Sequence, residues 1–402
     1  MLRFETAGES HGQCLVATLT GMPAGVPISL QSINHELWRR QQGYGRGGRM
    51  KIEQDEVEIL SGIRHGLTLG SPITLAVRNK DHANWSDVMS PDPLPDPAEA
   101  KAALSKRERT SPRPGHADLA GALKYLTRDL RNIIERSSAR DTAARVAAGM
   151  LVQAVLDLFG IEVRSHVVSI EGANVDHDVS FGDMAKAPSS DVGCVDDKVA
   201  EQMRACIDAA KKDGDTVGGE IEVAAMGVPP GLGSFAQWTS RLDGQLAQAM
   251  MSIPSVKAVA LGNGFEAGRR RGSGFHDKIG VEPGIAFTRP SNNAGGIEGG
   301  ISNGEEIRVR AIVKPIPTLM NRLPSVDLGT MAPAPAAIER SDTCVVPAAA
   351  VVGEAMVRIV LAQALLGTYG GDSRQQVLAH FESARQLRAR TFGFEPRPTE
   401  RN

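Results

Sequence analysis

The spacing of apolar residues predicts strands and helices mixed along the whole chain. Alternating or short apolar runs predict strands at Leu2–Thr6, Cys14–Thr20, Glu56–Ile63, Ile73–Val77, Ile161–Ile170, Glu220–Met226, Val256–Leu261 and Ile307–Val313. Helical spacing predicts helices at Ser32–Gln42, Ala98–Ser105, 119–134, Ala143–Phe159, Asp197–Lys211, Arg241–Met251, Pro347–Leu366 and Asp372–Arg388. Strands and helices do not alternate one for one, and there is no fixed repeat, so the pattern favours a single α+β unit.

Arg136–Thr142, which reads Arg-Ser-Ser-Ala-Arg-Asp-Thr, leads into the predicted buried helix Ala143–Phe159. Its two serines can cap the helix, and Asp141 would lie near the positive end of the helix dipole. Its two arginines stand where free backbone N–H groups point, which is the chemistry of an anion-binding site. A capped helix with solvated arginines is the alternative.

His11 lies in the glycine-flanked turn Gly8–Gly12, between the first two predicted strands. The turn fits the Gly-x-Ser-x-Gly pattern of serine hydrolases, but that motif needs a helix after the serine, and a strand is predicted here. A serine hydrolase is therefore a weaker alternative. A histidine in a turn near the surface is suited to proton transfer, so His11 is the first acid–base candidate, with a hydrogen-bonded turn residue as the alternative.

Basic residues crowd the end of the helix Ser32–Gln42 and the loop after it. They are Arg39, Arg40, Arg46, Arg49 and Lys51. Gly43–Gly48 fits Gly-x-Gly-x-x-Gly, but the dinucleotide fingerprint needs a strand before it and a helix after it, and the predicted order is the reverse. Glycines let a ligand approach the backbone and arginines bind carboxylate or phosphate, so an anion-binding loop is favoured over a solvated basic surface.

A long proline-rich stretch, 79–117, ends in Arg113-Pro-Gly-His116 just before a predicted helix. Loops of this length inside a compact chain are usually functional. We expect Arg113 and His116 to converge on one site with the two arginines of 136–142.

Two other stretches are interpreted from their composition. Residues 172–196 are polar and acidic without a clear pattern, which indicates a surface excursion. Residues 262–304 are rich in glycine, with serine and asparagine, which suits a flat polar ring or a phosphate approached by backbone. A flexible linker is the alternative for the second stretch.

The charge balance excludes a generally basic nucleic-acid binder. The chain has 402 residues, with 45 Lys+Arg against 47 Asp+Glu, and its 4% aromatic content also argues against base stacking. Its four cysteines show neither Cys-x-x-Cys pairing nor metal-ligand spacing, so no metal site is predicted. There is no signal segment and no apolar run near the ~18 residues of a membrane span, so we expect a soluble, cytoplasmic enzyme.

Seven motifs occur in an order that resembles one enzyme family. They are Gly8-Glu-Ser-His-Gly, Arg40-Gln-Gln-Gly-Tyr-Gly-Arg-Gly, Arg113-Pro-Gly-His-Ala-Asp, Arg136-Ser-Ser-Ala-Arg-Asp-Thr, Ser291-Asn-Asn-Ala-Gly-Gly, Lys314-Pro-Ile-Pro-Thr and Arg340-Ser-Asp. Each is modest alone, but together they resemble the chorismate synthase family over residues 1–370, and 371–402 would be a C-terminal helix and tail. The resemblance implies a single-domain β-α-β sandwich, with central antiparallel helices between two antiparallel sheets, and a homotetramer.

The resemblance also implies an activity. It is the 1,4-anti elimination of phosphate from 5-enolpyruvylshikimate 3-phosphate to give chorismate, the last step of the shikimate pathway to aromatic amino acids. The family requires reduced FMN, although the reaction is redox-neutral. The sequence leaves open whether the protein reduces its own flavin with NADPH or receives it from an external flavin reductase, with NADPH as an indirect reductant. The absence of a predicted dinucleotide fold favours the external supply. The two carboxylates and the phosphate of this substrate explain clustered arginines in a chain of net charge −2.

The same motifs imply a role for individual residues. His116 would protonate the departing phosphate, His11 would protonate the reduced flavin, and Asp342 would assist proton removal. The implied substrate ligands are Arg40, Arg46, Arg49, Arg113 and Arg140. The implied FMN contacts are Arg136, Ser137, Ser138, Pro254, Ser255, Gly299, Lys314, Pro315, Ile316, Pro317, Thr318 and Arg340.

Three positions depart from the family pattern. Asp141 stands where Glu is usual, Pro254-Ser255 stands where Asn-Ala is commoner, and Gly274–Lys278 lacks the usual acidic ending. A catalytically inactive flavin- or anion-binding protein on the same scaffold is the second hypothesis. The presence of His11, His116 and Asp342 beside the arginines favours the enzyme.

Overall fold

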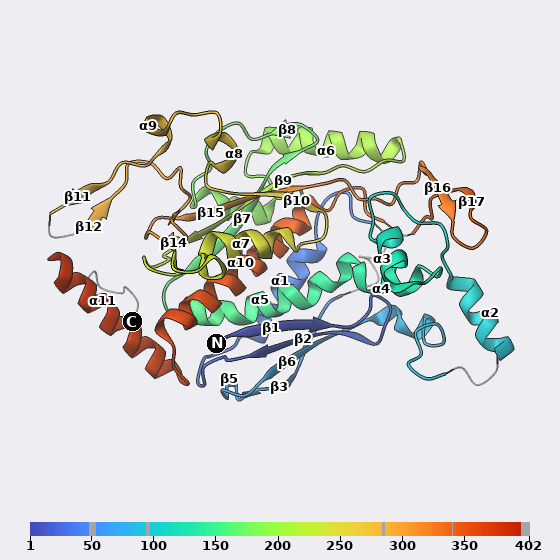
Figure 1. Ribbon diagram of the computed structural model, residues 1–402, viewed down its shortest axis with the longest axis horizontal. Coiled ribbons are helices and arrows are strands. Elements are labelled where there is room, and N and C mark those ends of the chain that lie inside the picture. Colours follow the sequence, from blue (N-terminus) through green and yellow to red (C-terminus); the bar gives the residue numbers. More distant parts are fainter. Residues whose placement is uncertain (48–53, 94–96, 284–285, 340, 395–402) are drawn as a thin grey trace.

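Two antiparallel sheets enclose a layer of helices in the computed structural model, which describes residues 1–47, 54–93, 97–283, 286–339 and 341–394 (Figure 1). The first sheet has the strand order β1 (Arg3–Ala7), β2 (Cys14–Thr20), β6 (Ile73–Arg78) and β3 (Val57–Ser61). The second has the order β10 (Val256–Leu261), β15 (Ile307–Val313), β9 (Gly219–Met226), β7 (Glu162–Ile170) and β8 (Ala173–Asn174). Between them lie α1 (Leu30–Gln41), α5 (Thr142–Asp157), α7 (Leu242–Met251) and α10 (Val346–Tyr369). The expected α+β sandwich is confirmed.

The helix α10 forms the centre of this layer because it is apolar on nearly every side. By length and composition it could cross a membrane, but 89% of that window is buried inside the protein, where α10 packs against α5, β7 and β9. Gly149 of α5 permits the close contact, because a Cβ at this position would lie only 2.5 Å from the Cα of Ala355. The apolar character of α10 is therefore that of a core helix.

The predicted helix 119–134 is wrong as a single helix. The chain forms α3 (Asp118–Tyr125), turns, and begins again as α4 (Arg131–Ser137). Leu126 ends α3 in the left-handed conformation, with φ 55°, and Asp129 accepts a hydrogen bond from the backbone N–H of Arg131 at the start of α4. The apolar spacing ran across the break because both helices contribute to one small cluster. Its buried members are Ala122, Leu130, Ile134 and Leu328.

Residues 172–196 do more than run over the surface, because they cover the outer face of the second sheet. The carbonyl of Val179 accepts a hydrogen bond of 2.7 Å from Arg308 of β15, and the guanidinium of Arg164 lies 4.3 Å from the centre of the Phe181 ring. The stretch buries Val175, Val179, Met184, Ala187, Val192 and Cys194. These residues follow no helical or strand period because loops and a short 3-10 helix (Asp183–Ser189) carry them.

The remaining elements extend the sandwich at its two ends (Figure 1). Near α3 and α4 lie α2 (Pro97–Arg107) and the hairpin of β16 (Pro324–Asp327) and β17 (Ala332–Pro335). At the other end lie α8 (Gly264–Ala267), α9 (Gly272–Phe275), β11 (Gly280–Glu282), β12 (Ala286–Thr288) and α11 (Arg374–Phe392). Outside the second sheet lies α6 (Asp197–Lys212). The short pairs are β4 (Ile63–Arg64) with β5 (Leu67–Thr68), and β13 (Ile297–Glu298) with β14 (Ile301–Ser302). The division of the chain at residue 370 stays a prediction.

Candidate active site

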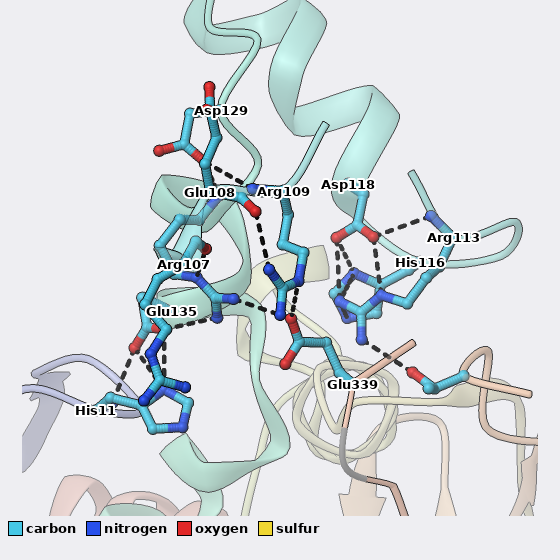
Figure 2. Close-up of polar contacts among 12 residues, drawn as sticks. His11, Arg107, Glu108, Arg109, Arg113, His116, Asp118, Asp129, Glu135 and Glu339 are labelled. Atoms are coloured by element: carbon cyan, nitrogen blue, oxygen red, sulfur yellow. Dashed lines mark hydrogen bonds and ion pairs between the residues drawn. The ribbon is translucent and has the colours of Figure 1, made fainter. Parts of the chain in front are cut away.

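Most of the predicted site residues lie at the end of the sandwich that carries α3, α4 and the start of α5 (Figure 1). Hydrogen bonds and ion pairs join five parts of the chain there. They are the turn Gly8–Gly12, the loop Gly43–Gly47, residues 109–118, α4 and residues 314–342. Figure 2 shows the contacts that surround the two candidate histidines.

The ring of His11 is fixed by a carboxylate and by an aromatic ring. Its Nδ1 lies 2.9 Å from Oε1 of Glu135, and its backbone N–H donates to Oε2 of the same residue at 2.8 Å. Trp85 stacks on the imidazole with the two ring centres 3.8 Å apart. Burial alone would raise the pKa of Glu135, but its contacts with His11 and Arg131 lower that pKa below the ordinary value. The carboxylate is therefore ionised, so Nδ1 donates to it and Nε2 is left for chemistry.

A row of alternating charges leads from His11 to residue 339 (Figure 2). Glu135 accepts from Arg131 at 3.2 Å, Arg131 donates to Glu339 at 2.9 Å, and Arg109 donates to the same Glu339 oxygen at 2.8 Å. Glu339, which directly precedes the Arg340-Ser-Asp motif, is thus linked to His11 through Arg131 and Glu135.

His116 stands in the same relation to a carboxylate as His11 does. Its Nδ1 lies 2.5 Å from Oδ1 of Asp118, and Arg113 donates from Nε to Oδ2 at 2.9 Å. Burial alone would raise the pKa of Asp118, but the hydrogen bonds from His116 and Arg113 bring it well below the usual range. Arg113 also donates to Oγ1 of Thr318 at 2.9 Å, which places a predicted substrate ligand against a predicted flavin contact.

Arg40 and Arg140 meet at one buried carboxylate, that of Asp55. Nη1 of Arg140 lies 2.5 Å from Oδ1 of Asp55, and Arg40 donates to the other oxygen. All three residues are at most 5% exposed. Nε of Arg140 donates to Asn79 at 3.0 Å, and the Asn79 amide donates to two backbone carbonyls of the turn that carries His11. The two arginines are therefore joined to the turn of the first histidine.

Asp342 lies against the glycine-rich loop. One of its oxygens accepts from the backbone N–H of Gly47 at 2.6 Å, and the other lies 3.2 Å from Nη1 of Arg46. Gly45 shows why the loop needs glycine, since its φ is 82° and a Cβ there would lie 2.8 Å from the side chain of Ile207. The loop is thus held closely against its neighbours.

The stretch Arg136–Thr142 supplies its own carboxylate to the start of α5. Asp141 accepts from Arg136 at 2.8 Å, from Arg145 at 2.8 Å and from Thr6 at 3.0 Å. Ser138 caps the short turn before α5 by accepting from the N–H of Arg140, and Ser137 donates back to a carbonyl of α4. The anion site expected at this helix start is thus largely occupied by Asp141 itself, where the family pattern has Glu.

The segment Lys314–Thr318 follows β15 and lies beside the loop of His116. Nζ of Lys314 donates to the carbonyl of Gly115 at 3.1 Å, and its backbone N–H donates to the carbonyl of Ser255 at 2.9 Å. Burial and the charge of Lys257 lower the pKa of the Lys314 ammonium. Within the described residues no carboxylate is paired with Lys314, so the position suits an anionic group.

One of the predicted residues, Gly299, does not join this group within one chain. Gly299 lies in the β13–β14 hairpin. The carbonyl of the following residue, Gly300, accepts a hydrogen bond from the N–H of Leu242 at the start of α7, whereas Pro254 and Ser255 follow the end of that helix. A helix of 10 residues is about 15 Å long, so Gly299 is far from the Lys314 segment within one chain. Arg49 and Arg340 lie outside the described residues.

Several hydrogen-bond donors of the glycine-rich stretch 262–304 bind a side chain of the same stretch, that of Asp277. Asp277 accepts from the hydroxyl of Ser291 at 2.6 Å and from the backbone N–H groups of Asn293 and Ala294 at 2.8 Å and 2.9 Å. Much of the polar character expected to meet a ligand is thus used internally.

Residues that the sequence interpretation missed hold the predicted ones in place. They are Asp55, Asn79, Trp85, Glu135 and Glu339. Glu135 stands directly before Arg136, so its position was a signal. Asp55 belongs to none of the seven motifs and lies 15 positions from Arg40 and 85 from Arg140. Across the residues with described positions, no group of three or more potential metal ligands is present.

Comparisons with known proteins show which family the chain belongs to. The family model described as chorismate synthase matches residues 2–366. The chorismate synthase of Solibacter usitatus is 52% identical over 387 residues, 95% of this chain and 98% of the relative. That of Moorella thermoacetica is 55% identical over 372 residues, 92% of this chain and 95% of the relative. A crystal structure of chorismate synthase matches with a TM-score of 0.75 at 43% identity, covering 95% of this chain and 97% of the other. The chain therefore belongs to the chorismate synthase family.

Proposed function

We propose that the protein eliminates phosphate from 5-enolpyruvylshikimate 3-phosphate to give chorismate, with reduced FMN as its cofactor. Family membership over nearly the whole chain supports the reaction. The observation that carries the proposal is the paired arrangement of the histidines. His11 and His116 each have Nδ1 on an ionised carboxylate, Glu135 and Asp118, beside clustered arginines.

The two histidines and Asp342 would divide the proton transfers between them. The C3–O bond of the substrate breaks as phosphate leaves with the bonding pair, and the C6–H bond breaks as the new double bond forms. A proton held at Nε2 of His116 would neutralise the departing phosphate, and Arg113 beside it would bind the same group. Asp342, held by Gly47 and Arg46, would assist removal of the C6 proton.

The buried arginines would bind the anionic groups of the substrate. Burial lowers the pKa of Arg40, and Arg46 and Arg140 lie close enough for their charges to lower it further. Because they are largely shielded from water, their contacts with carboxylate or phosphate would be stronger than at an exposed surface. Arg49 stays a predicted fourth member of this set.

The residues beside Lys314 fit a phosphorylated flavin. An ammonium without a carboxylate partner in the described part of the chain, next to a second lysine, matches the phosphate of FMN. The proposed contacts are Arg136, Ser137, Ser138, Pro254, Ser255, Lys314–Thr318 and Arg340, and Gly299 would join them only from another subunit of the proposed homotetramer. When bound, reduced FMN would supply electron density to the ring that loses phosphate. His11 would hold a proton at Nε2 toward that site.

We also propose a cytoplasmic homotetramer that receives reduced flavin from an external reductase. The family resemblance supports the assembly, and the reversed order around Gly43–Gly47, with α1 before it and β3 after it, supports the external source. Sedimentation velocity tests the tetramer. Oxidation of NADPH by the purified protein with FMN alone would contradict the external reductase.

An anaerobic assay tests the reaction with purified protein, substrate and chemically reduced FMN, following phosphate and chorismate together. We expect equal release of both, none with oxidised FMN, and strong slowing in His116→Ala. His380→Ala is the matched control. In the described chain, the hydrogen-bond partners of the His380 ring are the backbone carbonyls of Tyr369 and Gly370 at the end of α10. Flavin binding without phosphate release from the unaltered protein would support the inactive scaffold instead.

A further inference from the structure

Asp55 lies at the centre of the arginines that we assign to substrate binding. It is buried, at 5% exposure, and each of its oxygens contacts a different guanidinium, Arg40 on one side and Arg140 on the other. Its backbone N–H donates to the side chain of Gln41 at 3.1 Å, and two residues later Val57 donates to Asn34. The carboxylate is thus fixed to α1 from outside and directed inward at the arginines.

The charges around Asp55 show what it does to its partners. Burial and the charges of Arg140 and Arg46 together lower the pKa of Arg40 to about 10, while Asp55 opposes them. Three like charges in a water-poor place repel one another, and each guanidinium would turn toward solvent if nothing held it. Asp55 is the anion that keeps Arg40 and Arg140 side by side before any ligand arrives.

Arg40 keeps an unused hydrogen-bond donor within the described part of the chain. Nε of Arg40 is buried and has no hydrogen-bond partner among the described residues. Asp55 and Thr142 occupy the other end of the Arg40 guanidinium. The cluster is therefore held in shape by Asp55 but retains capacity for a further acceptor.

We propose that Asp55 is a positioning residue for the substrate's anionic groups, holding Arg40 and Arg140 in their binding geometry. The proposal rests on the proposed function, since the arginines are assigned through it. Asp55 itself would not touch the substrate. It acts by keeping two cations together, so that binding a carboxylate or phosphate requires no rearrangement of the arginines.

The chain contains a matched control for this arrangement. Glu354 of α10 is 1% exposed and also lies between two arginines, Arg39 at 3.0 Å and Arg358 at 2.7 Å. Ser165 of β7 donates to it, so this carboxylate lies inside the helical layer. Asp55→Asn and Glu354→Gln therefore each remove one negative charge from between two arginines. The first does so at the candidate site and the second in the core.

The experiment compares these two variants by steady-state kinetics and by thermal unfolding with and without inorganic phosphate. In D55N we expect KM for the substrate to rise about tenfold or more with kcat changed about threefold at most, since binding geometry is lost and the proton donors stay. Phosphate should raise the Tm of D55N by at least about 2 °C more than that of the unaltered protein, because the uncompensated arginines gain an anion. In E354Q we expect a lower Tm, an unchanged KM and no added phosphate effect.

A D55N variant that loses stability as E354Q does, with unchanged KM and no added phosphate effect, would show a merely structural role and overturn the proposal. If D55N does not fold, Asp55→Glu decides, because it keeps the charge but displaces it by one methylene. A raised KM in D55E supports positioning, and an unchanged KM contradicts it. Failure of the unaltered protein to form chorismate would refute the proposed function alone, since the phosphate effect on Tm is read without turnover.

Discussion

Arg39 and Arg40 are adjacent on α1, yet their guanidinium groups enter two separate buried ion clusters. Arg40 pairs with Asp55 at the candidate active site, whereas Arg39 pairs with Glu36 and Glu354 inside the helical layer. Successive residues on a helix point about 100° apart, so neighbours meet different surroundings. Of two adjacent arginines, one thus lies in the candidate site, where we propose that it binds substrate, and the other lies in the packed helical layer.

Replacing Glu36 by glutamine should destabilise the protein without changing its kinetics. Glu36 lies 2.8 Å from Arg39 and 3.1 Å from Arg358, so the variant leaves two buried arginines to share the carboxylate of Glu354. We expect the free energy of unfolding in urea to fall by about 3 kcal/mol. A loss below about 1 kcal/mol would mean that this pair contributes no more than a surface salt bridge.

Gly149→Ala should be destabilising although alanine is the better helix former. Its Cβ would lie 2.5 Å from Ala355, and α5 and α10 would have to separate. We expect a loss of about 1–3 kcal/mol in urea unfolding. Gly367 of α10 is the control, because no atom lies within 4 Å of a Cβ there, so Gly367→Ala should gain about 0.5–1 kcal/mol. Equal effects at both positions would contradict the close packing.

Glu135→Gln should slow turnover while leaving the fold intact. The neutral amide does not offset the positive charge that His11 carries when both ring nitrogens are protonated, so a proton at Nε2 is no longer held toward the site as firmly. We expect kcat to fall about 10- to 100-fold, as for other residues that orient a functional histidine. Glu382→Gln, which alters a surface pair with Arg385, should keep full activity. An unchanged pH–rate profile in the Glu135 variant would argue against the role of Glu135.

Acid should weaken the folded state through carboxylates of the site. Burial alone would raise the pKa values of Asp55, Asp118 and Glu135, but their arginine and histidine partners hold all three below the ordinary range. A carboxylate whose pKa is lower in the folded state stabilises the fold above its unfolded pKa, and that stability is lost as pH falls through the folded pKa. Urea unfolding should therefore show a steep loss below about pH 4. Asp118→Asn should flatten the slope, and an identical slope would contradict the assignment.

Cys344 should be unreactive until the protein unfolds. Burial raises the pKa of its thiol to about 12, and the side chain is fully buried beside the loop of Gly45. The thiolate is the reactive form, so alkylation by iodoacetamide at pH 8 should be negligible in the folded state. Mass spectrometry of labelled peptides, with and without urea, measures this directly. Rapid labelling of the native protein would show that the loop opens readily.

Local pattern was enough to locate the strands and most helices, but not the pairings that form the site. The strand Ile307–Val313 alternates along its whole length, and it was predicted to the residue. Apolar spacing runs on through the left-handed Leu126, because both helices pack into the same cluster, so the break was invisible. His11 and Glu135 are 124 positions apart. Their contact depends on how the first sheet and α4 are brought together, which no local spacing records.

The carboxylates that hold the arginines of the site in place also determine the electrostatic field that the site projects into solution. Asp55, Asp118, Glu135, Glu339 and Asp342 each accompany an arginine of the site. Among the described residues these carboxylates offset much of the arginine charge of the unliganded site, so it projects less long-range attraction toward polyanions such as nucleic acids. Binding of a small substrate with three or four negative charges then relies on short-range contacts. Its association rate should therefore vary little with ionic strength. In this way the site can contain many arginines without binding anions other than its substrate.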